Sequence, residues 1–443
     1  MDDTIAAITT PAGRGGVGII RLSGPQALAI AIKMIQKKTL PPRMAVFTQV
    51  FDETAEAIDQ GIVIYFKAPH SYTGEDVLEF QMHGSPYVLA EILRLCQLYG
   101  ARLARGGEFT ARAFLNDKMD LTQAEAVADL INAQSQTAAR MANRSLQGVF
   151  SAKVNAIDTA LKHLRMYVES TIDFSDEALE WLEKHHWEER LKQIIADIKQ
   201  LQAKAQQGQI MQQGLKIVIA GRPNAGKSTL MNALVEKDVA IVTSIAGTTR
   251  DVMKEHVLLD DIPVTLIDTA GLRETSDVIE QEGIKRAWQT ITEADMVLFL
   301  HDASCNDWQQ DALTPELKAK LPAGIALIHV LNKVDTIKNM PTTGICIAAK
   351  TGLGIDDLKQ RIKSHLGIVT EQSEFMARKR HCIIFAAVQQ ELEDAIAAFH
   401  HHQAPELLAE DLRFSHEHLM EITGQFSADD LLGEIFSHFC IGK

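Results

Sequence analysis

One short motif in the middle of the sequence combines the groups that bind a nucleoside triphosphate. Residues 221–228 read GRPNAGKS, which has the spacing G-x-x-x-x-G-K-S, with an apolar run before it and TLMNALV after it. The glycines allow backbone N–H groups to surround phosphates at the start of a helix. Lys227 would meet the β- and γ-phosphates, and the Ser228 hydroxyl would bind Mg²⁺. The motif predicts a phosphate site at a strand–helix junction.

Two further motifs predict which nucleotide binds. DTAG at 268–271 and NKVD at 332–335 each follow an apolar run typical of a buried strand. We expect Asp268 beside the magnesium ion and the Gly271 N–H near the γ-phosphate. The Asp335 carboxylate can accept both the ring N–H and the amine of guanine, a donor pair that adenine lacks. The three motifs in this order predict a Ras-like P-loop GTPase domain with a doubly wound sheet.

The last base-binding element departs from the usual pattern. IAAKTG at 347–352 has Ala348 where such domains usually carry serine, but we expect Ala349 and Lys350 to contact guanine mainly through the backbone. The residues expected to bind GTP are Asn224, Ala225, Gly226, Lys227, Ser228, Thr229, Thr243, Ser244, Ile245, Ala246, Gly247, Thr248, Thr249, Asp268, Thr269, Ala270, Gly271, Asn332, Lys333, Asp335, Ala349 and Lys350.

GTP hydrolysis needs a different arrangement from that of Ras, because Leu272 stands where Ras-type proteins have the glutamine that orients the attacking water. Positive charge for the transition state could come from Arg250. Alternatively, Asn224 and the loop 243–249 could hold a monovalent cation in that position. Thr249 would then be the second magnesium ligand and would close only on the triphosphate.

The elements that must position these residues fall into three regimes. Short β-like and helical runs alternate to about residue 116, long amphipathic helices follow to about 211, and a β–α alternation runs to about 370 before helices return. The fold class is therefore multidomain, α/β plus all-α. We expect an N-terminal α/β domain at 1–116, and a helical domain made of 117–211 and 374–443. A GTPase domain at 212–373 would be inserted into that helical domain.

Composition narrows the class of protein. The start lacks a secretory signal, no apolar run is long enough to span a bilayer, and five scattered cysteines are typical of reduced thiols in a cytoplasm. A net charge of −14 argues against indiscriminate binding of nucleic acid. The basic run at 377–381 could touch nucleic-acid phosphate or only coat a helix.

The whole chain resembles the MnmE (TrmE) family of tRNA-modification GTPases. The resemblance rests on PAGRGGVGIIRLSG, SYTGEDVLEFQMHG, GEFTARAFLNDKMDLTQAEAVADLI, GRPNAGKS, IAGTTRD, DTAGLRE and the terminal CIGK. It implies a K⁺ ion held by Asn224, Thr243, Ile245 and Thr248, which activates hydrolysis when two GTPase domains meet. It also implies that Glu280 is the catalytic glutamate. Without the resemblance, Glu280 would be read as a solvated acid at a helix start.

For the N-terminal domain the resemblance implies folate binding and formation of a homodimer. Arg21, Glu79, Lys118 and Lys443 would hold a tetrahydrofolate derivative, 5-formyl- or 5,10-methylene-tetrahydrofolate. We further hypothesise that the C-terminal tail is ordered and reaches this domain, with Cys440 near the substrate. Cys440 would act as a nucleophile or merely pack, and the alternative for the tail is a frayed end.

The implied reaction adds a carboxymethylaminomethyl or aminomethyl group to C5 of the wobble uridine (U34) of certain tRNAs in the cytoplasm. It would use the folate one-carbon unit and an FAD-dependent partner of the MnmG/GidA type, in a heterotetramer and away from membranes. The alternative is a ribosome-assembly or RNA-binding switch GTPase, which would carry the same three nucleotide motifs. Folate binding would distinguish the two.

Two patterns invite other interpretations. GRGGVG at 13–18 fits G-x-G-x-x-G, but the β-like run VGIIRLS follows it where a dinucleotide fold needs a helix, so we interpret it as a chance match. The histidines at 400–402, 416 and 418 resemble metal ligands, but no acidic or cysteine partner has a suitable spacing in the sequence.

Overall fold

A computed structural model describes most of the chain. The residues it describes are 3–172, 186–237, 254–268, 291–305, 319, 321–322, 325–337, 341, 344–365, 374–426, 429–437, 439 and 442. They form two compact units. The first consists of residues up to 128, 145–197 and 386 onwards, and the second of 129–144 and 198–385. The domain boundaries expected from the sequence stay a prediction.

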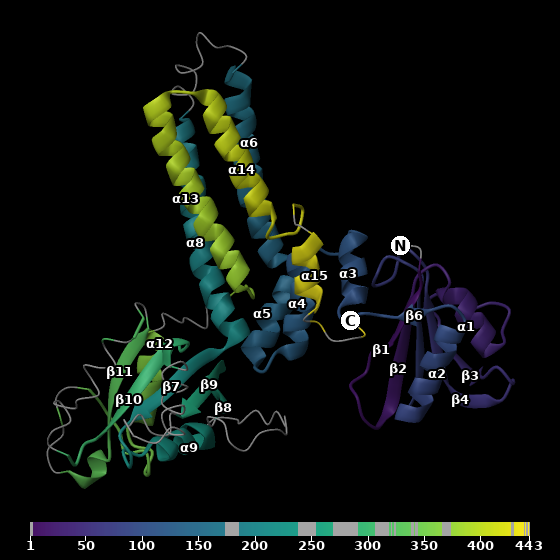
Figure 1. Cartoon of the computed structure of the whole chain (residues 1–443), viewed down its shortest axis with the longest axis horizontal. Coiled ribbons are helices and arrows are strands. Elements are labelled where there is room, and N and C mark those ends of the chain that lie inside the picture. Colours follow the sequence, from purple (N-terminus) through teal and green to yellow (C-terminus); the bar gives the residue numbers. More distant parts are fainter. Residues whose placement is uncertain are drawn as a thin grey trace, which may run out of the picture. The chain divides into compact units, whose positions relative to one another are not determined.

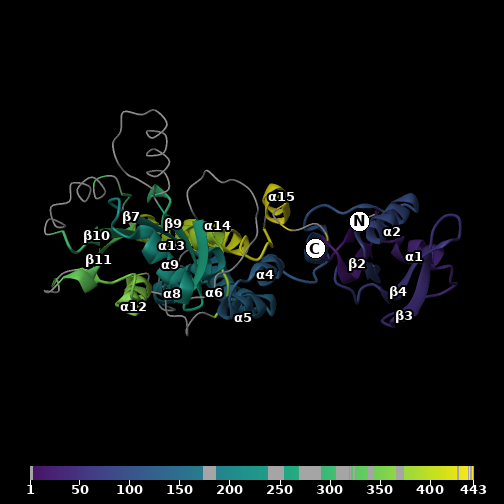
Figure 2. The ribbon, with the colours of Figure 1, turned by 90° about the horizontal axis from the view of Figure 1, so that it is seen from below.

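The first unit contains a six-stranded sheet in the order β3-β4-β5-β2-β1-β6, in which only the β1–β6 pair is parallel. Helices α1 and α2 pack on the sheet and bury its core, including Ile20, Phe80 and Ile92 (Figure 1). Strands β3 and β4 lie at one edge (Figure 2). The elements are β1 (Ile5–Ile8), β2 (Gly15–Ser23), α1 (Ala27–Ile35), β3 (Val46–Phe51), β4 (Ala57–Phe66), β5 (Val77–Gly84), α2 (Pro86–Leu98) and β6 (Arg102–Leu103).

Long helices make up the rest of this unit. Helix α14 packs along α6, where the His416 Nδ1 lies 2.6 Å from the Asp158 Oδ1. Trp187 of α8 packs edge-on against Phe399 of α13, with 4.6 Å between ring centroids. The helices, some of which continue into the second unit, are α3 (Glu108–Leu115), α4 (Leu121–Asn132), α5 (Gln136–Leu146), α6 (Val149–Ile172), α8 (Trp187–Gln213), α13 (Lys379–His402), α14 (Pro405–Met420) and α15 (Asp429–Ser437).

The second unit is built on a second six-stranded sheet, in the order β12-β11-β10-β7-β9-β8. All neighbouring strands are parallel except β8 and β9. The central strands are buried on both faces, as expected for a parallel sheet covered on both sides. The elements are β7 (Leu215–Gly221), α9 (Lys227–Lys237), β8 (Lys254–Leu259), β9 (Ile262–Asp268), β10 (Met296–Asp302), β11 (Ala326–Asn332), the short helix η2 (Val334–Thr336), β12 (Ile345–Cys346) and α12 (Ile355–His365).

This architecture confirms the predicted fold class of α/β sheets combined with a helical region. The carboxyl ends of β7, β9, β10 and β11 meet at one edge of the second sheet, the edge where doubly wound folds bind ligands. The helix predicted near the C-terminus is α15. None of the helices in the described part of the chain is long and apolar enough to cross a membrane.

Candidate functional site

The phosphate-binding motif forms a tight loop between β7 and α9. Asn224 and Gly226 adopt left-handed backbone angles, with φ of 64° and 96°. The Lys227 ammonium folds back over this loop and donates to the carbonyl oxygens of Gly221 at 3.0 Å and Arg222 at 3.2 Å. Lys227 therefore lies at the first turn of α9, where backbone N–H groups face an incoming phosphate.

Asp268 lies opposite this loop at the end of β9. Its Oδ2 is 3.4 Å from the Ser228 hydroxyl, and its buried Oδ1 has no hydrogen-bond partner among the described residues. Burial raises the pKa of Asp268, although the Lys227 charge and the Ser228 hydroxyl oppose the shift. Burial likewise lowers the pKa of Lys227, against the charge of Asp268. An orphaned buried carboxylate oxygen beside a serine hydroxyl fits Mg²⁺, which prefers such oxygen ligands.

Asn332, the first residue of NKVD, joins two loops. Its Nδ2 donates to the Ala225 carbonyl at 2.9 Å, and its Oδ1 accepts from the Ala349 N–H at 3.0 Å. The side chain is buried, and a Cβ at Gly226 would lie 2.3 Å from its Nδ2. Asn332 thus holds the phosphate loop and the 347–352 loop together from inside, a role that the motif alone did not specify.

The remaining base-site residues lie around Asn332. Asp335 is exposed on η2, where its carboxylate is accessible to a base. The Lys333 ammonium is 2.6 Å from the Asp302 carboxylate. Ala348 is fully buried and packs with Ala303, Leu331 and Val334, which accounts for a methyl group at this position. The structure therefore places the expected residues of all three motifs that it describes at one edge of the sheet.

The candidate folate residues lie in the first unit. Arg21 of β2 and Glu79 of β5 are cross-strand partners, with 2.9 Å between guanidinium and carboxylate. The Arg21 guanidinium also lies 5.3 Å from the Tyr72 ring centroid and 5.6 Å from that of Phe109. Lys118 lies against Gly74, since a Cβ at Gly74 would be 3.3 Å from the Lys118 side chain. Arg21 and Lys118 thus both contact the loop 71–76.

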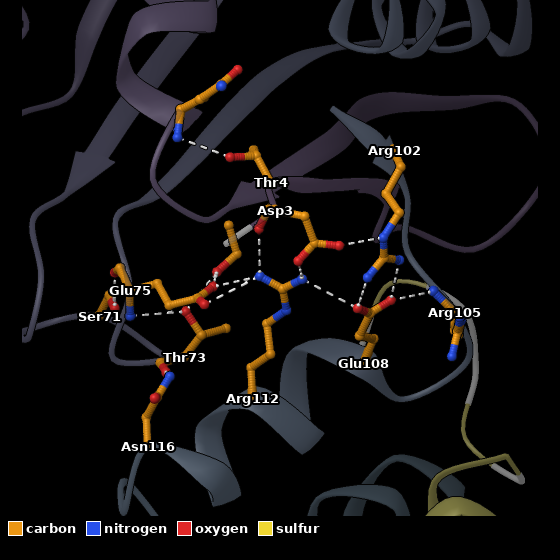
Figure 3. Close-up of polar contacts among 12 residues, drawn as sticks. Asp3, Thr4, Ser71, Thr73, Glu75, Arg102, Arg105, Glu108, Arg112 and Asn116 are labelled. Carbon is orange, nitrogen blue, oxygen red and sulfur yellow. Dashed lines mark hydrogen bonds and ion pairs between the residues drawn. The ribbon is translucent and has the colours of Figure 1, made fainter. Parts of the chain in front are cut away.

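A buried ion network fastens that loop (Figure 3). The Arg112 side chain is fully buried, and it donates to Glu75 of the loop at 3.0 Å, to Asp3 at 2.8 Å and to Glu108 at 3.2 Å. Glu108 also binds Arg102. Glu75, Glu108 and Arg112 lie within two of the motifs that carry the family resemblance, but their pairing is not evident from the sequence. Their signal was a dense set of polar residues in SYTGED and GEFTAR.

The C-terminal segment reaches the same domain. A Cβ at Gly107 would lie 2.7 Å from the Phe436 carbonyl oxygen, and one at Gly442 would lie 2.5 Å from that of Ile8. Gly442 is buried. These described residues of the C-terminal segment therefore contact the N-terminal domain, whereas the order of the whole tail stays a prediction.

Several expected site residues lie outside the described part of the chain. They are Thr243, Ser244, Ile245, Ala246, Gly247, Thr248, Thr249, Arg250, Thr269, Ala270, Gly271, Glu280, Cys440 and Lys443.

The structure also resolves the ambiguous patterns. Strand β2 begins inside GRGGVG, which confirms that no helix follows this motif. The histidines have acidic partners on other helices, which spacing along one segment could not reveal, and these contacts are pairs rather than groups of three or more possible metal ligands within the described part of the chain. His416, His418 and His400 contact Asp158, Glu391 and Glu188 from other helices. In the basic run, Arg378 pairs with Asp129 and His381 is buried, so the run does more than coat a helix.

Comparison with known proteins supports the resemblance over the whole chain. The model of the MnmE helical domain matches residues 121–440, and that of the GTP-binding protein TrmE N-terminus matches residues 4–118. The chain belongs to the MnmE family. It is 53% identical to the tRNA modification GTPases MnmE of Legionella pneumophila strains Paris and Corby, over 100% of this chain and 99% of each relative.

A similar solved structure is the G domain of the T. maritima FeoB iron transporter. It is 25% identical, covers 34% of this chain and 98% of that chain, and has a TM-score of 0.28. A TM-score this low supports no inference about function.

Proposed function

We propose that this protein is a GTP-hydrolysing enzyme of tRNA modification. The observation that carries the nucleotide part is the meeting of Lys227, Ser228 and the orphaned Asp268 carboxylate at the phosphate loop, with Asn332 and Asp335 at the base site. The tRNA part is supported by membership in the MnmE family and by the 53% identity to its tRNA modification GTPases.

The chain's own residues divide the work of hydrolysis. Lys227 would bind the β- and γ-phosphates, while Ser228 and Thr249 would hold Mg²⁺, which would neutralise phosphate charge. Asn224, Thr243, Ile245 and Thr248 would hold K⁺, which would supply the positive charge that an arginine finger supplies in other GTPases. Glu280 orients the attacking water through a second water, and Asp335 selects guanine.

The second part of the proposed function, folate binding for tRNA modification, belongs to the N-terminal domain. Arg21, Glu79, Lys118 and Lys443 bind a tetrahydrofolate derivative, with the Tyr72 and Phe109 rings supporting the Arg21 guanidinium. Cys440 would act on the uridine as a nucleophile or merely pack. The folate would supply the one-carbon unit that, with an FAD-dependent partner, becomes an aminomethyl-type group at C5 of the wobble uridine, and the protein would work as a homodimer in the cytoplasm.

The cation role is tested by comparing GTP turnover in K⁺ and Na⁺. A bound K⁺ that replaces an arginine finger should raise turnover on the order of 10³-fold or more, the lower end of what such a finger supplies. Asn224→Ala should remove most of the difference between the two salts. Equal wild-type rates in both salts would refute the role of Asn224.

The tRNA role is tested by mass spectrometry of tRNA nucleosides from a strain that lacks this protein. We expect the C5-modified wobble uridine to disappear and to return with the wild-type gene. Unchanged nucleosides would refute the proposed modification and point to the switch GTPase instead.

A further inference from the structure

Gly106 and Gly107, just before α3, lie directly under the C-terminal segment. A Cβ at Gly106 would lie 2.8 Å from the Phe439 carbonyl oxygen, and its next nearest atoms are the carbonyl oxygens of Ser437 at 3.6 Å and Phe436 at 3.8 Å. A Cβ at Gly107 would lie 2.7 Å from the Phe436 carbonyl oxygen and 2.8 Å from the Phe439 Cβ. Any side chain at either position would therefore push the tail away.

The tail is also anchored by apolar contacts next to these glycines. Phe436 and Phe439 pack together, with 5.4 Å between ring centroids, and both are buried with Leu121 and Ala124. The Phe439 N–H donates to the Phe436 carbonyl at 3.1 Å, which turns the chain at the end of α15. The chain thus leaves α15 in one direction across the glycine pair.

The residue that follows the glycine pair is held in place by hydrogen bonds and ion pairs. Glu108 follows it directly and accepts hydrogen bonds from the Arg105 N–H at 2.8 Å and from Arg102 at 2.9 Å. Glu108 also contacts the buried Arg112, which binds Glu75 in the loop 71–76 (Figure 3). The surface under the tail therefore belongs to the same ion network that fastens the loop beneath Arg21.

Gly442 lies against β1, the strand that pairs with the strand carrying Arg21. Three residues beyond Phe439, Gly442 lies against Ile8 and Thr9 at the end of β1, and its φ of +99° suits only glycine. Ile8 pairs with Ile20 of β2, the neighbour of Arg21. The seat at Gly106 and Gly107 and the contact of Gly442 with the end of β1 thus both place described residues of the C-terminal segment on the N-terminal domain.

We propose that Gly106 and Gly107 are positioning residues that seat the C-terminal segment on the N-terminal domain through Phe436 and Phe439. Neither glycine contacts substrate in this proposal; both act through the tail. The consequence for tRNA modification rests on the proposed function, whereas the seating of the tail does not.

Gly106→Ala is the decisive variant. Gly106 does not have a positive φ, so alanine fits its backbone and the nearest collision is with the tail. The matched control is Gly433→Ala on α15, because a Cβ there would meet nothing within 4 Å and would favour the helix. Both variants are made in the full-length protein, and circular dichroism checks that each is folded.

Hydrogen exchange of the peptide 435–443, measured by mass spectrometry, tests directly whether Gly106 and Gly107 hold the C-terminal segment in place. We expect exchange at the Phe439 amide to accelerate at least about tenfold in Gly106→Ala and not at all in Gly433→Ala, since exchange reports local opening. Exchange at wild-type rates in Gly106→Ala would contradict the proposal that Gly106 seats the C-terminal segment.

Measurements of tRNA modification, folate binding and GTP turnover then test whether the position of the C-terminal segment matters for function. In Gly106→Ala we expect tRNA modification to fall at least about tenfold and folate affinity to weaken, while K⁺-stimulated GTP turnover stays at the wild-type rate. Wild-type modification despite accelerated exchange would overturn the positioning role. If the wild-type protein itself neither binds folate nor modifies tRNA, the proposed function fails, and the exchange result still decides the seat.

Discussion

Within the proposed nucleotide site, the first and last residues of the NKVD motif differ in their environment. Asn332 is buried, and both ends of its amide bind the protein, at Ala225 and Ala349. Asp335 is exposed and accessible to a base. In the proposed function, selection of guanine would therefore fall on Asp335, whereas Asn332 holds together the two loops around it.

Asp335→Asn should shift the preference from GTP toward XTP, because the amide offers a donor where the carboxylate had only acceptors. Loss of hydrogen bonds to a charged group should weaken GTP binding roughly 10- to 150-fold. Binding of fluorescent GTP and XTP analogues measures both affinities. Unchanged GTP affinity with no gain for XTP would contradict the assignment of NKVD.

Ala348→Ser should restore the usual residue of this loop without improving nucleotide binding. The Ala348 side chain is packed among Ala303, Leu331 and Val334, so a hydroxyl there would be buried among apolar groups. We expect a loss of about 1–3 kcal/mol in the unfolding free energy of the second unit. Denaturant unfolding and GTP titration measure the two effects, and a clear gain in GTP affinity would contradict this view.

Among the elements, the sequence predicted best the strands and loops whose own residues form a recognisable pattern. The apolar runs before Gly221, Asp268 and Asn332 are strands, and each motif lies at a strand end as expected. Partners that come from distant parts of the chain were missed, because spacing along one segment cannot reveal them. Arg112, with partners on β1's N-terminal side and in the loop 71–76, and His416 with Asp158 are the main cases.

The start of α3 should respond to acid through Glu108. Burial would raise the pKa of Glu108, but hydrogen bonds from Arg102 and the Arg105 N–H outweigh it and hold the pKa below its ordinary value of 4.5. The stabilisation from Glu108 is therefore complete above about pH 4.5 and is lost as the pH falls through the lower folded-state pKa. Hydrogen exchange of peptides spanning α3, corrected for the intrinsic rate at each pH, should show weaker protection in acid.

Glu108→Gln should make that protection less dependent on pH, since the amide does not titrate. Asp117→Asn is the control, because Asp117 is an exposed carboxylate with no ion-pair partner within the described ranges. An equally steep acid response in Glu108→Gln and in the control would show that other groups govern the stability of α3.

For the whole molecule, the two units divide the proposed chemistry. The described phosphate and base residues lie within the second unit, and the tail and its glycine seat lie within the first. Each function should therefore be removable without the other. Sequence patterns predicted a separate GTPase domain but not the contact that seats the tail, since neither Gly106 nor Phe439 carries a pattern that would indicate it.

Deletion of residues 440–443 tests that separation. We expect tRNA modification to be abolished and folate binding to weaken, while K⁺-stimulated GTP turnover stays close to that of the wild type. Cys440→Ser should keep folate binding and impair modification if the thiol is a nucleophile. A truncated protein that modifies tRNA normally would show that the tail is a frayed end, and a silent Cys440→Ser alone would show that the thiol only packs.

The contact between Gly226 and Asn332 constrains how the sequence can evolve. A Cβ at Gly226 would lie only 2.3 Å from the Asn332 amide nitrogen, in a glycine whose φ of +96° already disfavours other residues. A side chain introduced at position 226 would thus collide with Asn332. A smaller residue at position 332 would lose the hydrogen bonds that join the phosphate loop to the loop 347–352. Neither position can change first without loss, so in lineages that keep the nucleotide site the two residues should be inherited together.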